Sequence, residues 1–163
     1  MNPLVSIDYM GALCIVLFGF GWAKPVQVEM RNFRNPKRDM AITALAGPLM
    51  NLLIAFVFTF IFVALVKFIT LPAIIYYFIF YFITLNISLA VFNLIPIPPL
   101  DGSRVLTAFL PNRIYYKIMQ YERFIAYAFM ILLFFGARLN FISTISGGIF
   151  NGFLSLAAAV FGL

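Results

Sequence analysis

Two long uncharged segments constrain this sequence more than any other feature. The first runs from Ala41 to Val66, and the second runs from Leu71 to Leu100, with prolines beginning at Pro96. About 20 apolar residues in a helix cross the hydrocarbon core of a bilayer, so each segment is long enough to span a membrane. Only a short stretch containing Lys67 and the helix breaker Pro72 separates them. This pattern predicts two membrane helices joined by a tight turn at one membrane face.

The composition supports a membrane protein. Hydrophobic residues make up 64% of the 163 residues and charged residues 10%, whereas a soluble domain is about half apolar and a quarter charged. These values exclude a soluble globular domain, a disordered chain and an ordinary nucleic-acid-binding module. The net charge of +6 needs no nucleic-acid partner, because the basic residues lie in loops beside apolar segments, where they set topology.

Further apolar segments complete the predicted fold. The 14 uncharged residues between Arg123 and Arg138 are short for a span unless the helix begins earlier, near Ile114. Residues 139–163 are uncharged but rich in Gly and Ser, which favours close helix contact. Met10–Trp22 is better suited to a re-entrant or interfacial segment. We therefore expect an all-α polytopic membrane protein with about four transmembrane helices and a short N-terminal re-entrant or interfacial segment.

The basic residues predict the orientation. Five of the eleven lie in residues 23–40 and four in residues 101–123, while Lys67 and Arg138 stand alone in their turns. Lys/Arg excess marks the cytoplasmic side, so both long loops should be cytoplasmic. We expect one membrane-embedded domain over residues 1–163. Its parts are 1–40 (re-entrant segment and basic cytoplasmic loop), 41–100 (first helix pair ending in the proline-rich break), 101–123 (cytoplasmic loop) and 124–163 (C-terminal hydrophobic spans).

The proline-rich break is the first candidate site. Three prolines between residues 96 and 99 cannot continue a helix, and carbonyls freed at membrane depth must be buried in protein or line a wet cavity. Asp101 follows this break, and acidic residues near a membrane interior are functional candidates. Alternatively, Asp101 is an N-cap for a cytoplasmic helix that starts near Ser103. Both interpretations stay open at this level.

Two asparagines are further candidates. Asn51 lies four residues after Gly47 in the segment Ala46-Gly47-Pro48-Leu49-Met50-Asn51, on the same face of a helix. Asn51 is either functional or hydrogen-bonded to a neighbouring helix at a packing notch. Asn93 precedes the proline-rich break and is either functional or bonded to the carbonyls that the prolines expose.

Taken together, these segments resemble a known family. Four motifs match the short bacterial branch of the site-2 proteases, which are zinc-dependent intramembrane metalloproteases, in order and spacing: Gly19–Val26, Arg31–Pro36, Ala46–Asn51 and Asn93–Leu106. The resemblance runs from Asn2 to about Arg123. Beyond that point the chain is similar only in being hydrophobic.

The resemblance implies a mechanism and a location. Family members hold Zn²⁺ with two histidines of an HExxH helix and one aspartate from a later segment. Asp101 occupies the position of that aspartate. The HExxH glutamate acts as the general base toward zinc-bound water. Asn51 and Asn93 match positions that orient substrate or stabilise the transition state. The implied substrate is a membrane-embedded protein, and the implied location is the bacterial inner membrane. The expected partners are the lipid bilayer and this substrate, and no nucleic acid. A homo-oligomer or a regulatory membrane partner is also compatible with the resemblance.

One departure from the family pattern is clear. The chain contains no histidine, and HExxH should precede Asn2-Pro3-Leu4, so this chain alone should neither hold zinc nor cleave. Three accounts fit: an N-terminally truncated protease, a non-catalytic pseudoprotease that binds membrane helices, or a small transporter or assembly subunit whose resemblance misleads. We prefer truncation, because Met1 directly precedes the expected tripeptide.

Overall fold

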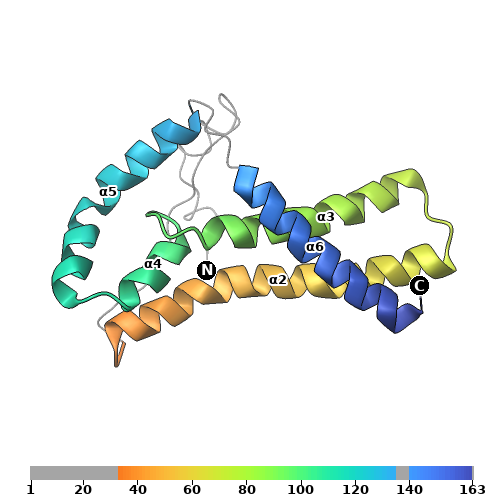
Figure 1. Ribbon diagram of the computed structural model, residues 1–163, viewed down its shortest axis with the longest axis horizontal. Helices are drawn as coiled ribbons and strands as arrows, with labels where there is room; N and C mark the ends of the chain where they lie inside the picture. Colours follow the sequence, from red (N-terminus) through yellow and green to blue (C-terminus); the bar gives the residue numbers. More distant parts are fainter. Residues whose placement is uncertain (1–32, 135–139, 163) are drawn as a thin grey trace, which may run out of the picture. The chain divides into compact units, whose positions relative to one another are not determined.

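A computed structural model describes residues 33–134 and 140–162, and within these ranges it contains helices but no strand (Figure 1). The elements are α2 (Pro36–Phe68), α3 (Ala73–Asn93), α4 (Asp101–Ala108), α5 (Asn112–Phe134) and α6 (Asn140–Phe161). The predicted all-α fold class is confirmed. The re-entrant segment expected at Met10–Trp22 lies outside the described residues.

Helix α2 is longer than the uncharged segment that predicted it. It has 33 residues, or about 50 Å at 1.5 Å per residue, and it begins at Pro36. Proline is tolerated in the first turn because its missing N–H would have no partner there. Asp39 supports this start by accepting a hydrogen bond from the backbone N–H of Asn35 at 3.1 Å. The helix also continues through Pro48, which is buried, so Gly47 and Pro48 lie inside the helix rather than at its beginning.

Helices α2 and α3 form an antiparallel hairpin. Residues 69–72 join them, and the N–H of Ile69 closes the end of α2 by donating to the carbonyl of Leu65 at 2.8 Å. The N–H groups of Ile75 and Tyr76 both donate to the carbonyl of Pro72. This turn lies where Lys67 and Pro72 predicted it.

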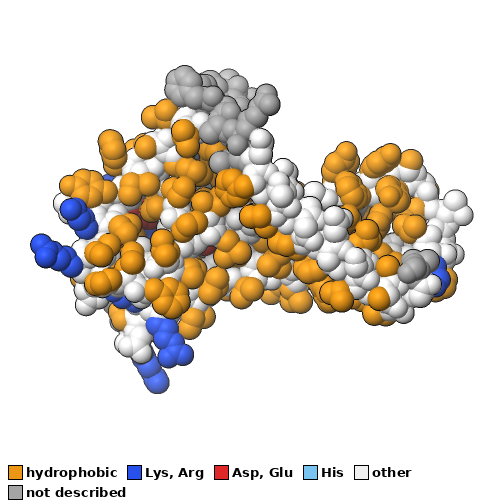
Figure 2. Space-filling view, in the orientation of Figure 1, with side chains coloured by type: hydrophobic (Ala, Val, Ile, Leu, Met, Phe, Trp, Pro, Cys, Tyr) orange, Lys and Arg blue, Asp and Glu red, His pale blue; other side chains and the backbone are white. Residues whose placement is uncertain are grey.

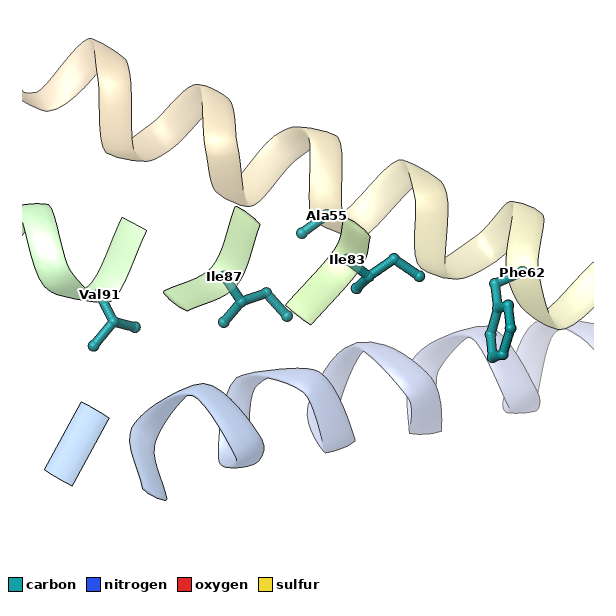
Figure 3. Close-up of a cluster of buried hydrophobic side chains, with 5 residues drawn as sticks. All are labelled: Ala55, Phe62, Ile83, Ile87 and Val91. Atoms are coloured by element: carbon teal, nitrogen blue, oxygen red, sulfur yellow. The ribbon is translucent and has the colours of Figure 1, made fainter. Parts of the chain in front are cut away.

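Side chains from α2 and α3 form the main buried cluster, and α6 packs against it (Figure 3). Ala55, Ile83 and Ile87 are completely buried. Aromatic pairs join each pair of helices: Phe58–Phe82 between α2 and α3, Phe56–Phe153 between α2 and α6, and Phe80–Phe150 between α3 and α6. Lipid tails are as apolar as these side chains, so close packing rather than escape from water holds such helices together.

Three described helices, α2, α3 and α6, are long and apolar enough to cross a membrane. Helix α5 occupies the position of the other expected span and begins at Asn112, near the expected Ile114. It is not among the three, because its first half carries Arg113, Lys117, Glu122 and Arg123. Lys and Arg side chains gather where α2 begins and where α4 and α5 meet, while apolar side chains cover most of the remaining visible face (Figure 2).

Residues 101–123, which were expected to form a cytoplasmic loop, are largely helical, and the two helices begin close to the starts considered near Ser103 and Ile114. This region contains all of α4 and the first half of α5. Tertiary contacts hold this region in place. Tyr115 is buried, and Arg104 of α4 forms an ion pair with Glu122 of α5 at 2.5 Å.

Candidate functional site

One side of the proline-rich break packs against the rest of the protein. After α3 ends at Asn93, residues 94–100 are irregular, and Ile95 and Leu100 are buried against Phe129 of α5. Within the break, the N–H of Leu100 donates to the carbonyl of Ile97 at 3.0 Å. The described residues therefore enclose part of this irregular backbone, while Leu94, Pro96, Ile97 and Pro99 remain exposed.

Asp101 is the first residue of α4 and does not cap it. The N-cap is Leu100, and no side chain makes a capping hydrogen bond there. Instead, the hydroxyl of Ser103 donates to the carbonyl of Leu100 at 2.7 Å. The alternative interpretation required a helix that starts near Ser103 with Asp101 outside it. Because the helix already includes Asp101, its carboxylate is available for another role, although its charge still favours a helix N-terminus.

Gly102 fixes where this carboxylate lies. A Cβ atom at Gly102 would be 2.2 Å from the carbonyl oxygen of Leu94 and 2.6 Å from that of Ile95. Both contacts are with backbone, which cannot rotate away as a side chain can. The start of α4 therefore lies against the carbonyls of the break at a distance that only glycine permits. Nothing in the local sequence indicates this role for Gly102.

The structure brings Asp101 to Gly47 of α2. A Cβ atom on Gly47 would lie 3.7 Å from Oδ2 of Asp101, and α4 packs along α2. The motif that contains Gly47 and the motif that contains Asp101 are thus neighbours in space. The absence of a side chain at Gly47 leaves that side of the carboxylate uncrowded.

The electrostatic environment of Asp101 contains two opposing influences. Partial burial raises the pKa of Asp101 above its ordinary value, and the positive charge of Arg104 acts in the opposite direction. Arg104 lies three residues later on the same helix, where side chains are neighbours. Its guanidinium also contacts the sulfur of Met119 at 3.4 Å and pairs with Glu122. Arg104 therefore links the candidate site to α5.

The two asparagines flank this region on separate helices. Asn51 lies on α2, one helical turn beyond Gly47, and is partly buried. Asn93 is the last residue of α3 and is also partly buried. Within residues 33–134 and 140–162, neither amide side chain forms a hydrogen bond to another side chain or backbone group. The described residues therefore do not show the hydrogen bonds to a neighbouring helix or to freed carbonyls that were the alternative interpretations of Asn51 and Asn93.

The described residues alone do not make a complete metal site. They contain no group of three His, Cys, Asp or Glu side chains that could hold a metal ion. A catalytic zinc ion needs about three protein ligands. Asp101 has the right chemistry and an uncrowded approach for one of them.

Comparison with known proteins decides the family. The model of peptidase family M50 matches residues 69–136, which include Asn93, the break and Asp101. The Bacillus subtilis protein named "Putative zinc metalloprotease YwhC" is 33% identical over 138 residues, or 82% of this chain. The chain belongs to the site-2 protease family, peptidase family M50. It is accordingly a membrane protein, consistent with the three apolar helices among the residues that the structure describes.

A second relative extends the comparison. The Methanocaldococcus jannaschii protein named "Putative zinc metalloprotease MJ0611" is 38% identical over 99 residues, or 60% of this chain. The aligned segments span 62% of the Bacillus protein and 49% of the Methanocaldococcus protein. No solved structure matches the chain.

Proposed function

We propose that this chain forms part of an intramembrane zinc metalloprotease and that Asp101 is one of its zinc ligands. The substrate is a membrane-embedded protein helix. The observation that carries the proposal is the position of Asp101: its carboxylate faces the vacant side of Gly47 and takes no part in capping α4. The names of both relatives, as zinc metalloproteases, support the same metal.

The remaining ligands come from polypeptide other than these 163 residues, which contain no histidine. Bound zinc supplies a water of lowered pKa for hydrolysis. The residues of this chain have separate tasks: Asp101 binds the metal, Gly102 holds Asp101 in place, and the amides of Asn51 and Asn93 orient the substrate backbone. The chain by itself is therefore inactive. The complete protein lies in a bacterial inner membrane with residues 23–40 and 101–123 in the cytoplasm.

The test uses a complete protein in which these residues are joined to an HExxH segment from the same locus or a close relative. Zinc content and cleavage of a membrane-embedded substrate are measured together. Asp101→Ala should abolish both, because loss of a ligand removes the metal that activates water. Asp39→Ala is the matched control, since it also removes a carboxylate, and it should retain zinc and activity. Normal zinc content and cleavage in Asp101→Ala would overturn the assignment.

The absence of histidine also favours a second candidate: a non-catalytic protein that binds membrane helices. The same complete protein distinguishes the two. Binding of the substrate without cleavage or zinc, despite an intact HExxH segment, would favour the non-catalytic function.

A further inference from the structure

Two adjoining cavities lie at the opposite end of α2 from its basic N-terminus. One has a volume of about 360 Å³ and is lined by residues 66–71 of the α2–α3 turn together with Tyr76. The other has a volume of about 280 Å³ and lies among α2, α3 and α6. Val66 and Tyr76 line both cavities, so the two meet at these residues.

The cavity at the turn contains hydrogen-bond donors and a positive charge. Lys67, Thr70 and Tyr76 line it, contributing an ammonium group and two hydroxyl groups. In the sequence, Lys67 is the only charged residue between Asp39 and Asp101. Its ammonium donates a hydrogen bond to the carbonyl of Phe161 near the end of α6. An ammonium group has three N–H donors, so this bond leaves capacity for an anionic oxygen.

The second cavity is apolar. Phe62, Phe80, Phe150 and Leu154 are among its lining residues, and it continues from the turn toward the middle of the helices. The T-shaped contact between Phe80 and Phe150, with ring centroids 5.5 Å apart, shows that α3 and α6 approach closely at this level. A hydrocarbon chain matches the chemistry of this lining, whereas a polar ligand would lose its hydration there.

We propose that the two cavities together bind one anionic phospholipid. The phosphate lies in the cavity at the turn, where Lys67 supplies the opposite charge, and one acyl chain occupies the apolar cavity among α2, α3 and α6. Charge complementarity selects the occupant, because a basic side chain at a membrane face favours an anionic headgroup. The lipid links the α2–α3 turn to α6, at the end of the helices remote from Asp101. This site is independent of the proposed protease function.

Native mass spectrometry of the purified 163-residue chain tests the proposal. The probes are phosphatidylglycerol and phosphatidylcholine with identical acyl chains, added in competition. The wild-type chain should prefer phosphatidylglycerol by about fivefold. Lys67→Gln should abolish this preference, and Lys67→Arg should keep it because the charge remains. Lys117→Gln, which removes an exposed lysine of α5, is the matched control and should also keep it.

A second arm examines the acyl chain. Ala158→Phe adds bulk to the wall of the apolar cavity and should weaken binding of both lipids while leaving their ratio unchanged. Excess inorganic phosphate should not displace phosphatidylglycerol, since it has no acyl chain. The proposal is overturned if the wild-type chain shows no preference, if Lys67→Gln retains it, if Lys117→Gln loses it equally, or if inorganic phosphate displaces the lipid.

Discussion

The ammonium of Lys37 donates a hydrogen bond to the backbone carbonyl of Leu110, 2.8 Å away, across 73 positions of sequence. The same ammonium lies 5.0 Å from the centroid of the Tyr115 ring, a cation–π contact. Lys37 is in the first turn of α2, and Leu110 is the second residue after the end of α4. Since Asp101 at the start of α4 faces Gly47, α4 is positioned on α2 near both of its ends.

Lys37→Gln should loosen the C-terminal end of α4. Hydrogen bonds to charged groups contribute about 1.5 kcal/mol or more, so amide hydrogen exchange near Thr107 and Leu110 should accelerate roughly tenfold. Arg38→Gln, at an exposed neighbouring position, is the control and should leave exchange there unchanged. Equal exchange in the two variants would show that Lys37 does not hold α4.

Gly102→Ala should destabilise the chain, because the added Cβ meets two backbone carbonyls. Overpacking of this kind typically costs about 1–3 kcal/mol. Gly148→Ala is the matched control: a Cβ there meets nothing within 4 Å, and alanine is the better helix former by about 0.5–1 kcal/mol. Thermal unfolding in detergent should therefore show a lower Tm for Gly102→Ala than for Gly148→Ala. The reverse order would contradict the close approach at Gly102.

Replacing the amides should reduce cleavage without removing the metal. In the complete protein with its HExxH segment, Asn51→Ala and Asn93→Ala should each lower kcat by about 10²–10³, the usual cost of losing one positioned donor. Zinc content should stay near that of the unmodified protein. Asn112→Ala, at an exposed position at the start of α5, should leave kcat unchanged. Loss of zinc in Asn93→Ala would indicate that this amide supports the metal site instead.

The isolated 163-residue chain should hold no stoichiometric zinc. It offers Asp101 but no imidazole, and such a ligand set is too small for a zinc ion. Elemental analysis after dialysis measures this directly. One tightly bound zinc per chain would reveal ligands outside the described residues or shared between copies.

Asn35 and Asn112 should face the cytoplasm, and Thr70 should face the opposite side. The two basic segments hold nine Lys/Arg residues, against one at the α2–α3 turn. Single-cysteine labelling in intact cells, with Asn35→Cys, Thr70→Cys and Asn112→Cys each on a Cys14→Ser background, gives the sidedness. Labelling of positions 70 and 112 from the same side would refute this topology.

The parts of the fold that depend on local sequence could be predicted. Uncharged length identified α2, α3 and α6, and the prolines identified the break after Asn93, because both effects act within a few residues. The family resemblance singled out Asp101, Asn51 and Asn93. It could not show that Asp101 faces Gly47, because that contact depends on how α4 packs against α2.

Long-range contacts account for what the sequence did not reveal. The arrangement of α4 and α5 involves the burial of Tyr115 and the Arg104–Glu122 ion pair, and local sequence does not reveal which residues form such contacts. Residue 102 must be glycine because the backbone carbonyls of Leu94 and Ile95 leave no room for a side chain there. A glycine after an aspartate in a sequence is equally compatible with an ordinary turn.

The length of α2 bears on how water reaches Asp101. Gly47 and Lys67 are 20 residues apart in one helix, or about 30 Å along its axis, which equals the usual thickness of the hydrocarbon core. If Lys67 lies at one membrane face, Gly47 and the adjacent Asp101 lie level with the other face. A tilt of about 20° changes this depth by only about 2 Å. Under the proposed protease function, water would then reach the zinc site at Asp101 from the nearby aqueous phase, and the substrate helix would present its scissile bond near the membrane surface.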